Sequence, residues 1–175
     1  MTVLPGWERS PAFVFDAARC ALSVLDQAHL PFEQRYLQPG SVADCARAIR
    51  DMNVRGAPLI GLVAAAGMAF AARADASDAA LEAAAALLIA SRPTAVNLRW
   101  AVEDLQAVLR TAPLAARAAA AAARVLALQH SESACCARIG EHGLGIMRAL
   151  ADTPRVRERG VLNVLTHCNA GWLAT

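Results

Sequence analysis

The sequence contains no lysine. All 17 basic residues are arginines, and they are spread along the 175 residues rather than gathered into one patch. The formal net charge is only +2. A surface that binds nucleic acid requires clustered positive charge, so this distribution argues against a nucleic-acid partner.

Signals for export and for disulfide bonding are also missing. Residues 1–10 lack the basic and then apolar pattern of a signal peptide. The cysteines are odd in number and show no metal-finger spacing; they are Cys20, Cys45, Cys135, Cys136 and Cys168. Both features predict a protein of the reducing cytoplasm.

No metal centre is expected either. Cys135 and Cys136 lie near Glu141 and His142, which suggests a metal or redox site as one alternative. Neighbouring residues on a helix point about 100° apart, so two adjacent cysteines do not easily chelate one ion together. Core packing or a surface position is the favoured interpretation of this pair.

One uncharged stretch, Ala57–Ala72, is the candidate for a membrane span. It has 16 residues, contains Pro58, Gly61 and Gly67, and ends at Arg73. A membrane-spanning helix needs about 20 residues. We therefore expect a buried helix of a globular protein and no membrane partner.

The composition itself favours one helix-rich globular core. Hydrophobic residues make up 57% of the chain and charged residues 18%, which is typical of a folded domain rather than of disorder. Much of the apolar fraction is alanine, the strongest helix former. No repeat of fixed period is present.

The first forty residues differ from the rest. Short apolar segments around Phe13–Phe15, Leu22–Leu25 and Phe32–Leu37 are separated by proline and glycine, which predicts a small antiparallel sheet within residues 1–40.

Residues 41–152 predict a helical bundle. A helix is expected from Val42 to about Met52, with Ser41 as its N-cap and Asp44 completing a short capping box. The later helical patterns cover Pro58–Arg73, Asp78–Ser91, Ala95–Arg110 and Leu114 to about Leu150. Three glycines interrupt the last pattern and are positions at which the helix would kink or divide; they are Gly140, Gly143 and Gly145.

The last residues predict the start of a second domain. Residues 153–160 are polar and indicate a linker. The run Val161–Leu165 is typical of a buried parallel strand, so residues 161–175 are expected to begin a Rossmann-like α/β domain that is truncated at Thr175. The predicted fold class is therefore an α+β amino-terminal domain followed by one strand. A strand without neighbours leaves backbone groups unpaired, so we expect residues after Gly160 to be misplaced, disordered or paired with another chain.

Two arginines precede predicted helices. Arg55 stands before Gly56, Ala57 and Pro58, where free backbone N–H groups at a helix start favour an anion such as phosphate. The alternative is an ordinary helix-entry turn whose arginine faces water or pairs with Asp51.

The second arginine repeats this arrangement. Arg92 precedes Thr94, which is expected to be the N-cap of the next helix. Two arginines at two helix starts can clamp a phosphate group. Here the alternative is a solvent-facing arginine or an ion pair with Glu103.

Cys168 is the first candidate for chemistry. It follows the predicted strand, where open α/β sheets place their ligands. The alternative is a packing role, which is the commoner fate of a lone cysteine. His167 can serve as its base only if the strand has already ended, because adjacent residues of a strand point to opposite faces. Asn169 is suited to orienting a hydroxyl or carbonyl oxygen.

Three segments carry a resemblance to a known family. They are Arg55-Gly-Ala-Pro-Leu-Ile-Gly61, Ser91-Arg-Pro-Thr-Ala-Val-Asn97 and Leu165-Thr-His-Cys-Asn-Ala-Gly171. In this order they closely resemble signature segments of the methylthioribose-1-phosphate isomerases, the aldose–ketose isomerases of methionine salvage. Leu25-Asp-Gln27 with Leu30-Pro31 resembles the start of the same family. The likeness covers nearly the whole chain from about Trp7, but not the second half of the family.

The resemblance implies a function. Members of the family convert 5-methylthioribose 1-phosphate to 5-methylthioribulose 1-phosphate in the cytoplasm, as homodimers, without metal or organic cofactor. By resemblance, Cys168 is the catalytic cysteine, and Arg55, Gly56, Ala57 and Arg92 match substrate-binding positions. The partner aspartate and other substrate-binding residues belong to the carboxyl-terminal domain of the family and have no counterpart here. We therefore expect these 175 residues to be inactive alone.

Two related functions stay open. The same superfamily includes ribose-1,5-bisphosphate isomerase and the regulatory subunits of translation initiation factor 2B, so the chain could instead be a phosphosugar- or nucleotide-sensing module. Cys168 together with Arg55-Gly-Ala-Pro favours the methylthioribose-phosphate isomerase.

Overall fold

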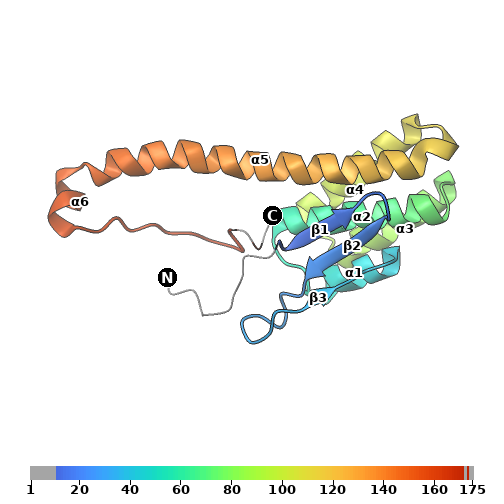
Figure 1. Cartoon of the computed structure of the whole chain (residues 1–175), viewed down its shortest axis with the longest axis horizontal. Coiled ribbons are helices and arrows are strands. Elements are labelled where there is room, and N and C mark those ends of the chain that lie inside the picture. Colours follow the sequence, from blue (N-terminus) through green and yellow to red (C-terminus); the bar gives the residue numbers. More distant parts are fainter. Residues whose placement is uncertain (1–10, 172, 174–175) are drawn as a thin grey trace.

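The computed structural model describes residues 11–171 and residue 173. A three-stranded antiparallel sheet lies against a helical bundle (Figure 1), as the sequence predicts. Its strands, in the order β1-β2-β3, are β1 (Phe13–Asp16), β2 (Ala21–Leu25) and β3 (Tyr36–Leu37). The third strand is shorter than the expected Phe32–Leu37 because β2 ends at Leu25, so only Tyr36 and Leu37 find partners.

The bundle is formed by helices from α1 to α5. The helical elements of the described chain are α1 (Val42–Arg50), α2 (Ala57–Ala74), α3 (Asp78–Ser91), α4 (Val96–Thr111), the short 3₁₀ helix η1 (Leu114–Ala116), α5 (Arg117–Ala151) and α6 (Pro154–Arg159). Helix α2 lies at the centre and packs against α1, α3, α4 and α5.

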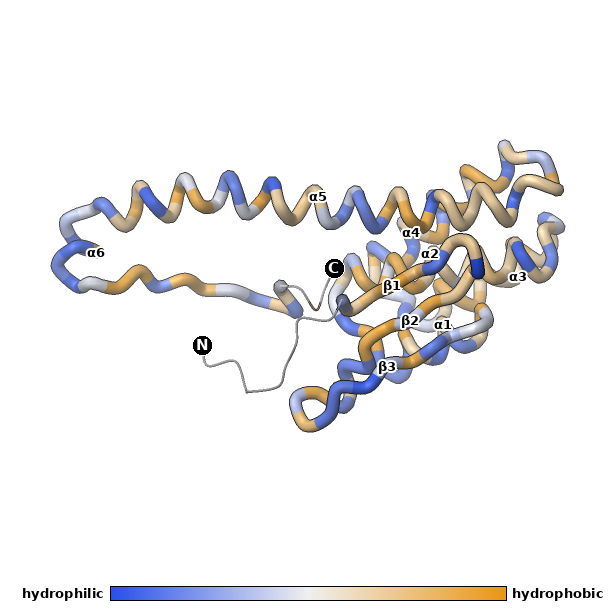
Figure 2. Tube along the Cα trace, viewed as in Figure 1, coloured by the Kyte–Doolittle hydropathy of each residue, from blue (hydrophilic) through white to orange (hydrophobic). Residues whose placement is uncertain are grey.

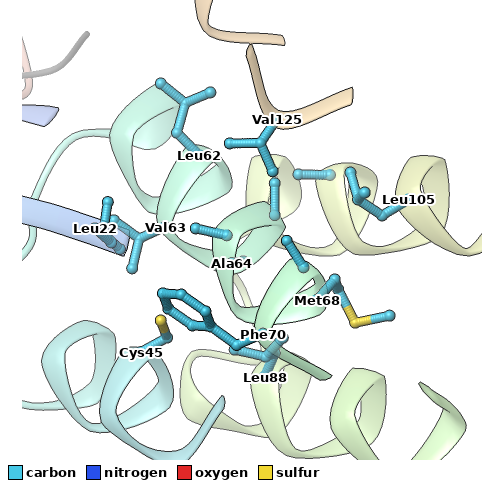
Figure 3. Packing of buried hydrophobic residues seen from close by; sticks show 14 of the residues in the cluster. Leu22, Cys45, Leu62, Val63, Ala64, Met68, Phe70, Leu88, Leu105 and Val125 are labelled. Atoms are coloured by element: carbon cyan, nitrogen blue, oxygen red, sulfur yellow. The ribbon is translucent and has the colours of Figure 1, made fainter. Parts of the chain in front are cut away.

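Helix α2 explains the uncharged stretch of the sequence. By length and composition it could cross a membrane, but 78% of it is buried inside the protein. Figure 3 shows side chains from the sheet and from four helices surrounding it: Leu22, Cys45, Leu88, Leu105 and Val125. A helix enclosed on all sides must be apolar on all sides, so the expectation of a buried core helix is confirmed.

Close helix contacts account for two glycines of α2. A Cβ atom at Gly67 would lie 3.0 Å from Leu88 of α3 and 3.3 Å from Cys45 of α1. A Cβ atom at Gly61 would lie 3.0 Å from the backbone oxygen of Asn97 in α4. Glycine at these positions lets the four helices approach closely, and Gly61 brings the amino-terminal part of α2 next to the first turn of α4.

Helix ends follow the predicted caps in part. Ser41 Oγ accepts a hydrogen bond from the Asp44 backbone N–H at 3.1 Å, as expected. Hydrogen bonds from the Ser41 hydroxyl and the Gly40 N–H lower the pKa of the Asp44 carboxyl. Helix α1 ends at Arg50 rather than at Met52, because Met52 adopts a left-handed φ of 60°.

The predicted N-cap at Thr94 is wrong. Helix α4 begins at Val96 with Ala95 as the N-cap and without a side-chain cap in the described structure. A turn closed by the Ala95 N–H and the Arg92 oxygen at 3.0 Å includes Thr94, which shifts the helix start by one residue. Arg92 is the C-cap of α3.

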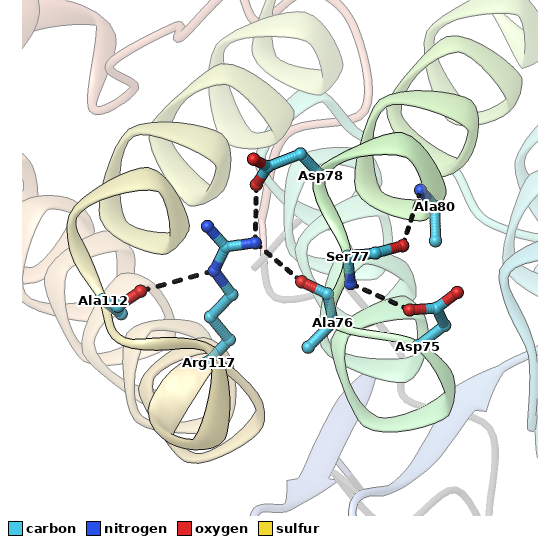
Figure 4. Close-up of polar contacts among 7 residues, drawn as sticks. All are labelled: Asp75, Ala76, Ser77, Asp78, Ala80, Ala112 and Arg117. Carbon is cyan, nitrogen blue, oxygen red and sulfur yellow. Dashed lines mark hydrogen bonds and ion pairs between the residues drawn. The ribbon is translucent and has the colours of Figure 1, made fainter.

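A buried arginine connects helices at the end of the bundle where α2 ends and α5 begins. Arg117, at the start of α5, donates to the Ala76 oxygen at 2.7 Å, to Asp78 Oδ1 at 2.6 Å and to the Ala112 oxygen at 3.4 Å (Figure 4). These bonds offset the cost of burying the guanidinium and tie α5 to the loop between α2 and α3.

Helix α5 is one unbroken helix, so the three glycines neither kink nor divide it in this structure. A Cβ atom added at any of them would meet no other group within 4 Å. The outer half of α5 extends beyond the bundle and mixes hydrophobic and hydrophilic residues (Figure 2). Ile139, Ile146 and Leu150 are exposed there.

The chain then returns toward the bundle. The predicted linker includes α6, which begins with Pro154 in its first turn and ends at Gly160, where φ is 65°. The strand expected at Val161–Leu165 is not confirmed: these residues have no strand pairing in the described structure, and Leu165 is 97% exposed. A parallel strand requires neighbouring strands, and among residues 11–171 none pairs with this segment.

Candidate functional site

The start of α2 presents free backbone donors. Gly56 is the N-cap, with φ 95°, and no described side chain caps the helix. The first turn contains no acidic residue. Pro58 has no N–H, so the unpaired donors there are the N–H groups of Ala57, which is exposed, and of Leu59, which is fully buried. Their partial positive charge favours an anionic ligand.

The start of α4 repeats these properties and lies beside the start of α2. It has no side-chain cap and no acidic residue in its first turn. Gly61, one turn into α2, lies close to the Asn97 oxygen in the first turn of α4. The amino-terminal ends of α2 and α4, each with a partial positive charge, therefore lie near each other.

The two candidate arginines have no acidic partner among the described residues. Asp51, the alternative partner for Arg55, pairs instead with Arg50 at 2.9 Å. Glu103, the alternative partner for Arg92, lies 3.8 Å from Arg99. The ion pairs considered for these arginines are thus not formed in the described structure, whereas the other alternative, an arginine that faces water, agrees with the exposed position of Arg55 and the partly exposed position of Arg92.

Gln27 connects two of the three signature segments. It follows β2 and is only 6% exposed. Its Nε2 donates to the Arg55 oxygen at 3.2 Å and to the Leu173 oxygen at 2.8 Å. Its Oε1 accepts a hydrogen bond from Asn169 Nδ2 at 3.1 Å. The loop that carries Arg55 and the loop that carries Cys168 therefore meet at one buried amide.

Asp26 supports Gln27 from the same turn. Asp26 Oδ1 accepts from Asn53 Nδ2 at 2.9 Å and from the Ala28 N–H at 3.1 Å, while Oδ2 lies 2.7 Å from His29 Nδ1. Burial alone would raise the pKa of the Asp26 carboxyl, but these hydrogen bonds outweigh burial and lower the pKa. The Gln27 N–H also donates to the Asn53 oxygen at 2.8 Å, which fixes the chain just before Arg55.

Cys168 lies in an exposed turn. Its φ is 66°, a left-handed value that is uncommon outside glycine. The thiol is exposed, so the packing role considered for it is not supported. His167 is exposed too, and Asn169 uses its side-chain amide to bind Gln27 rather than pointing it freely into solution.

The structure joins two of the three predicted segments directly and places the helix that follows the third beside α2. Gln27 joins the Arg55 loop to the Cys168 loop, and Gly61 joins the start of α2 to α4, which follows Arg92. Sequence reasoning did not assign a role to Gln27. The available signal was a pair of polar residues directly after a buried strand, where a buried polar side chain must find partners.

The alternative metal site is not formed in the described residues. Cys135 and Cys136 are exposed on α5, and no group of three or more His, Cys, Asp or Glu side chains in the described structure is arranged to hold a metal ion.

Similar proteins fall into one group. The sequence profile of the initiation factor 2 subunit family matches residues 53–175. The chain is 52% identical over 160 residues to a protein of Methylorubrum populi named methylthioribose-1-phosphate isomerase, covering 91% of this chain and 43% of that protein. It is 49% identical over 154 residues to the protein of the same name from Paramagnetospirillum magneticum, covering 88% of this chain and 41% of that protein.

Solved structures share the fold. 5-Methylthioribose 1-phosphate isomerase from Pyrococcus horikoshii OT3 matches with a TM-score of 0.63 and 27% identity, over 69% of this chain and 36% of that one. The delta subunit of translation initiation factor eIF-2B from A. fulgidus matches with a TM-score of 0.62 and 30% identity, over 69% and 37% of the two chains.

These matches also define the extent of the likeness. The chain spans about two fifths of the length of the curated relatives it matches, at 43% and 41%. The profile match covers more than half of the chain and includes Arg55, Arg92 and Cys168. The chain belongs to the initiation factor 2 subunit family.

Proposed function

We propose that this chain is the amino-terminal part of an isomerase that converts 5-methylthioribose 1-phosphate to 5-methylthioribulose 1-phosphate in methionine salvage. The observation that carries the proposal is the meeting of the Arg55 and Cys168 loops at Gln27, in a chain 52% identical to a named isomerase. A cytoplasmic location and a homodimeric complete protein remain predictions from the resemblance.

The phosphate group is assigned to the two helix starts. The exposed Ala57 N–H at the Gly56-capped start of α2 and the positive end of α4 provide donors, and Arg55 and Arg92 provide full charges. No acidic side chain occupies the first turn of either helix. Such a site binds a phosphate monoester through charge-assisted hydrogen bonds.

Cys168 is assigned to the reacting carbons. In the net reaction a hydrogen moves from C2 to C1 and the bond between C1 and the ring oxygen breaks. The C2 hydroxyl loses its proton and becomes a carbonyl, while the released ring oxygen takes up a proton and becomes a hydroxyl. One group must handle the hydrogen while a second acts on the neighbouring oxygen. The Cys168 thiol is exposed and can fill one of these roles. The second group is expected from the remainder of a complete protein, so the 175 residues alone are expected to be inactive.

A chimera tests this function. The amino-terminal part of the Methylorubrum populi isomerase would be replaced by this chain, since the two align over 91% of its length. The chimera is expected to convert 5-methylthioribose 1-phosphate, and the isolated chain is not. A correctly folded chimera without turnover would contradict the proposal.

Ligand binding tests the regulatory alternative. Titration of the isolated chain with 5-methylthioribulose 1-phosphate should give saturable binding that Arg55→Met weakens by at least about tenfold, because one charge-assisted contact is worth roughly 1.5–3 kcal/mol. Arg110→Met, an exposed arginine at the end of α4, is the control and should leave binding unchanged. Tighter binding of a nucleotide than of the sugar phosphate would favour a sensing module instead.

A further inference from the structure

We infer that Gln27 is the positioning residue that holds the Cys168 loop against the Arg55 loop. The inference rests on the proposed function, because it concerns the same site. Gln27 does not need to touch the substrate to act in this way. It sets where the thiol stands relative to the phosphate-binding helix starts.

The first step of the argument is burial. The Gln27 side chain is 6% exposed, yet it uses both of its polar atoms in bonds to other segments. Burying an amide group costs free energy unless its polar atoms form hydrogen bonds. The folded state is therefore most stable when both loops lie against Gln27 and form these bonds.

The second step is the sequence separation of the partners. Arg55 lies 28 residues from Gln27, Asn169 lies 142 residues away and Leu173 lies 146 residues away. The amide therefore joins the end of β2, the entrance of α2 and the returning carboxyl-terminal segment. Between α6 and this point, the described chain has no strand or helix to hold it, so its placement depends on local contacts.

The third step is that the contact is anchored on both sides. Asp26 and the Asn53 loop fix the Gln27 backbone, through the Gln27 N–H bond to the Asn53 oxygen at 2.8 Å. On the other side, Leu173 packs against the hydrophobic core as well as accepting the Gln27 bond. Cys168 is adjacent to Asn169, so its position is set by the hydrogen bonds of Gln27 to Asn169 and Leu173, which we call the Gln27 clamp.

Nuclear magnetic resonance of the 175-residue chain tests whether the Gln27 clamp holds Cys168 in place, and it needs no enzymatic activity. Backbone order parameters near 0.85 indicate rigidity and values below about 0.6 indicate flexibility. We expect Cys168 and Asn169 to be rigid in the wild type and flexible in Gln27→Met, which preserves size but removes both polar atoms. Arg117→Met is the control, because it removes a buried hydrogen-bonded side chain at the opposite end of α2.

A second variant removes the same bond from the exposed loop. Asn169→Leu should raise the mobility of Cys168, because it removes the Gln27 bond next to Cys168. The double variant should add little mobility to that of Gln27→Met, which already removes this bond together with those to Arg55 and Leu173. Since Asn169 lies outside the bundle core, this variant keeps the test valid even if Gln27→Met unfolds. Unchanged order parameters in Asn169→Leu would overturn the inference.

Kinetics of the chimera separate this inference from the proposed function. Gln27→Met should lower kcat by about 10- to 100-fold with a smaller change in KM, because a displaced catalytic group loses rate more than binding. Turnover of the parent chimera with an unchanged kcat in Gln27→Met would overturn the positioning role alone. A parent chimera without turnover would instead overturn the proposed function, while the order parameters would still decide whether Gln27 holds the loop.

Discussion

Replacing Gly61 by alanine tests whether close contact between α2 and α4 sets the position of the two helix starts. In an unconstrained helix this change stabilises a protein by about 1 kcal/mol, because alanine is the better helix former. Here the new Cβ atom would lie 3.0 Å from the Asn97 oxygen and 3.5 Å from the Ala101 Cβ atom. The nearest atom belongs to the backbone of α4, so the contact is relieved only by moving the helices apart.

The expected magnitude follows from two opposing terms. Overpacking in a core costs about 1–3 kcal/mol. Over most of this range the cost is larger than the gain of about 1 kcal/mol from helix propensity. We therefore expect Gly61→Ala to lower the free energy of unfolding by about 1 kcal/mol. For a chain of this size that corresponds to a fall in Tm of about 2–4 °C. The affinity for 5-methylthioribulose 1-phosphate should fall as well, because the donors of α2 and α4 separate.

The control for this prediction measures how much an exchange between alanine and glycine changes the free energy of unfolding at an exposed helix position of the same protein. Ala86 is exposed in the middle of α3, so Ala86→Gly should cost about 1 kcal/mol through propensity alone. Both variants would be unfolded by heat and by urea. If Gly61→Ala stabilises the protein by as much as Ala86→Gly destabilises it, the close contact does not constrain the two helices and the reasoning is wrong.

Three further predictions concern the core, pH dependence and the carboxyl-terminal segment. Leu105→Ala should lower the free energy of unfolding by about 2–5 kcal/mol because Leu105 is fully buried, whereas Leu114→Ala, at a residue 63% exposed, should change it by less than about 0.5 kcal/mol in urea titrations. The folded-state pKa of Asp26 is lowered from 3.8, so its ionised form adds stability above about pH 3.8 that is lost as the pH falls through the lower folded-state value. The difference in unfolding free energy between wild type and Asp26→Asn should therefore shrink below about pH 3.8 in urea titrations, and a difference independent of pH would refute this. Backbone amides of Val161–Leu165 have no strand partner in the described structure and should exchange with deuterium far faster than those of α2; strong protection in a proven monomer would contradict it.

Local patterns were sufficient to predict most of the bundle from the sequence. The helix α3 has the predicted bounds Asp78–Ser91, and Ser41 caps α1 as expected, because caps and helical periodicity act within a few residues. The errors at Met52 and Thr94 also have local causes. Each residue lies in a turn whose backbone geometry has no strong signal in side-chain chemistry.

The site was predictable only in its separate parts. Arg55, Arg92 and Cys168 were named from helix starts, a strand end and a family resemblance, but nothing in their spacing indicates that a single amide joins two of the loops. Contacts over 142 residues depend on how the whole chain packs. The strand at Val161–Leu165 was not confirmed for a related reason, since an apolar run forms a parallel strand only when neighbouring strands complete its hydrogen bonds.

The chimera described above gives the most direct test of the central claim that Cys168 performs chemistry at a sugar-phosphate site. Its turnover would be measured with Cys168→Ser and, as the matched control, with Cys135→Ser, which changes another exposed cysteine on α5. We expect Cys168→Ser to lower kcat by at least about 100-fold, the usual contribution of a positioned proton-transfer group, and Cys135→Ser to leave it unchanged. Normal turnover in Cys168→Ser would contradict the account.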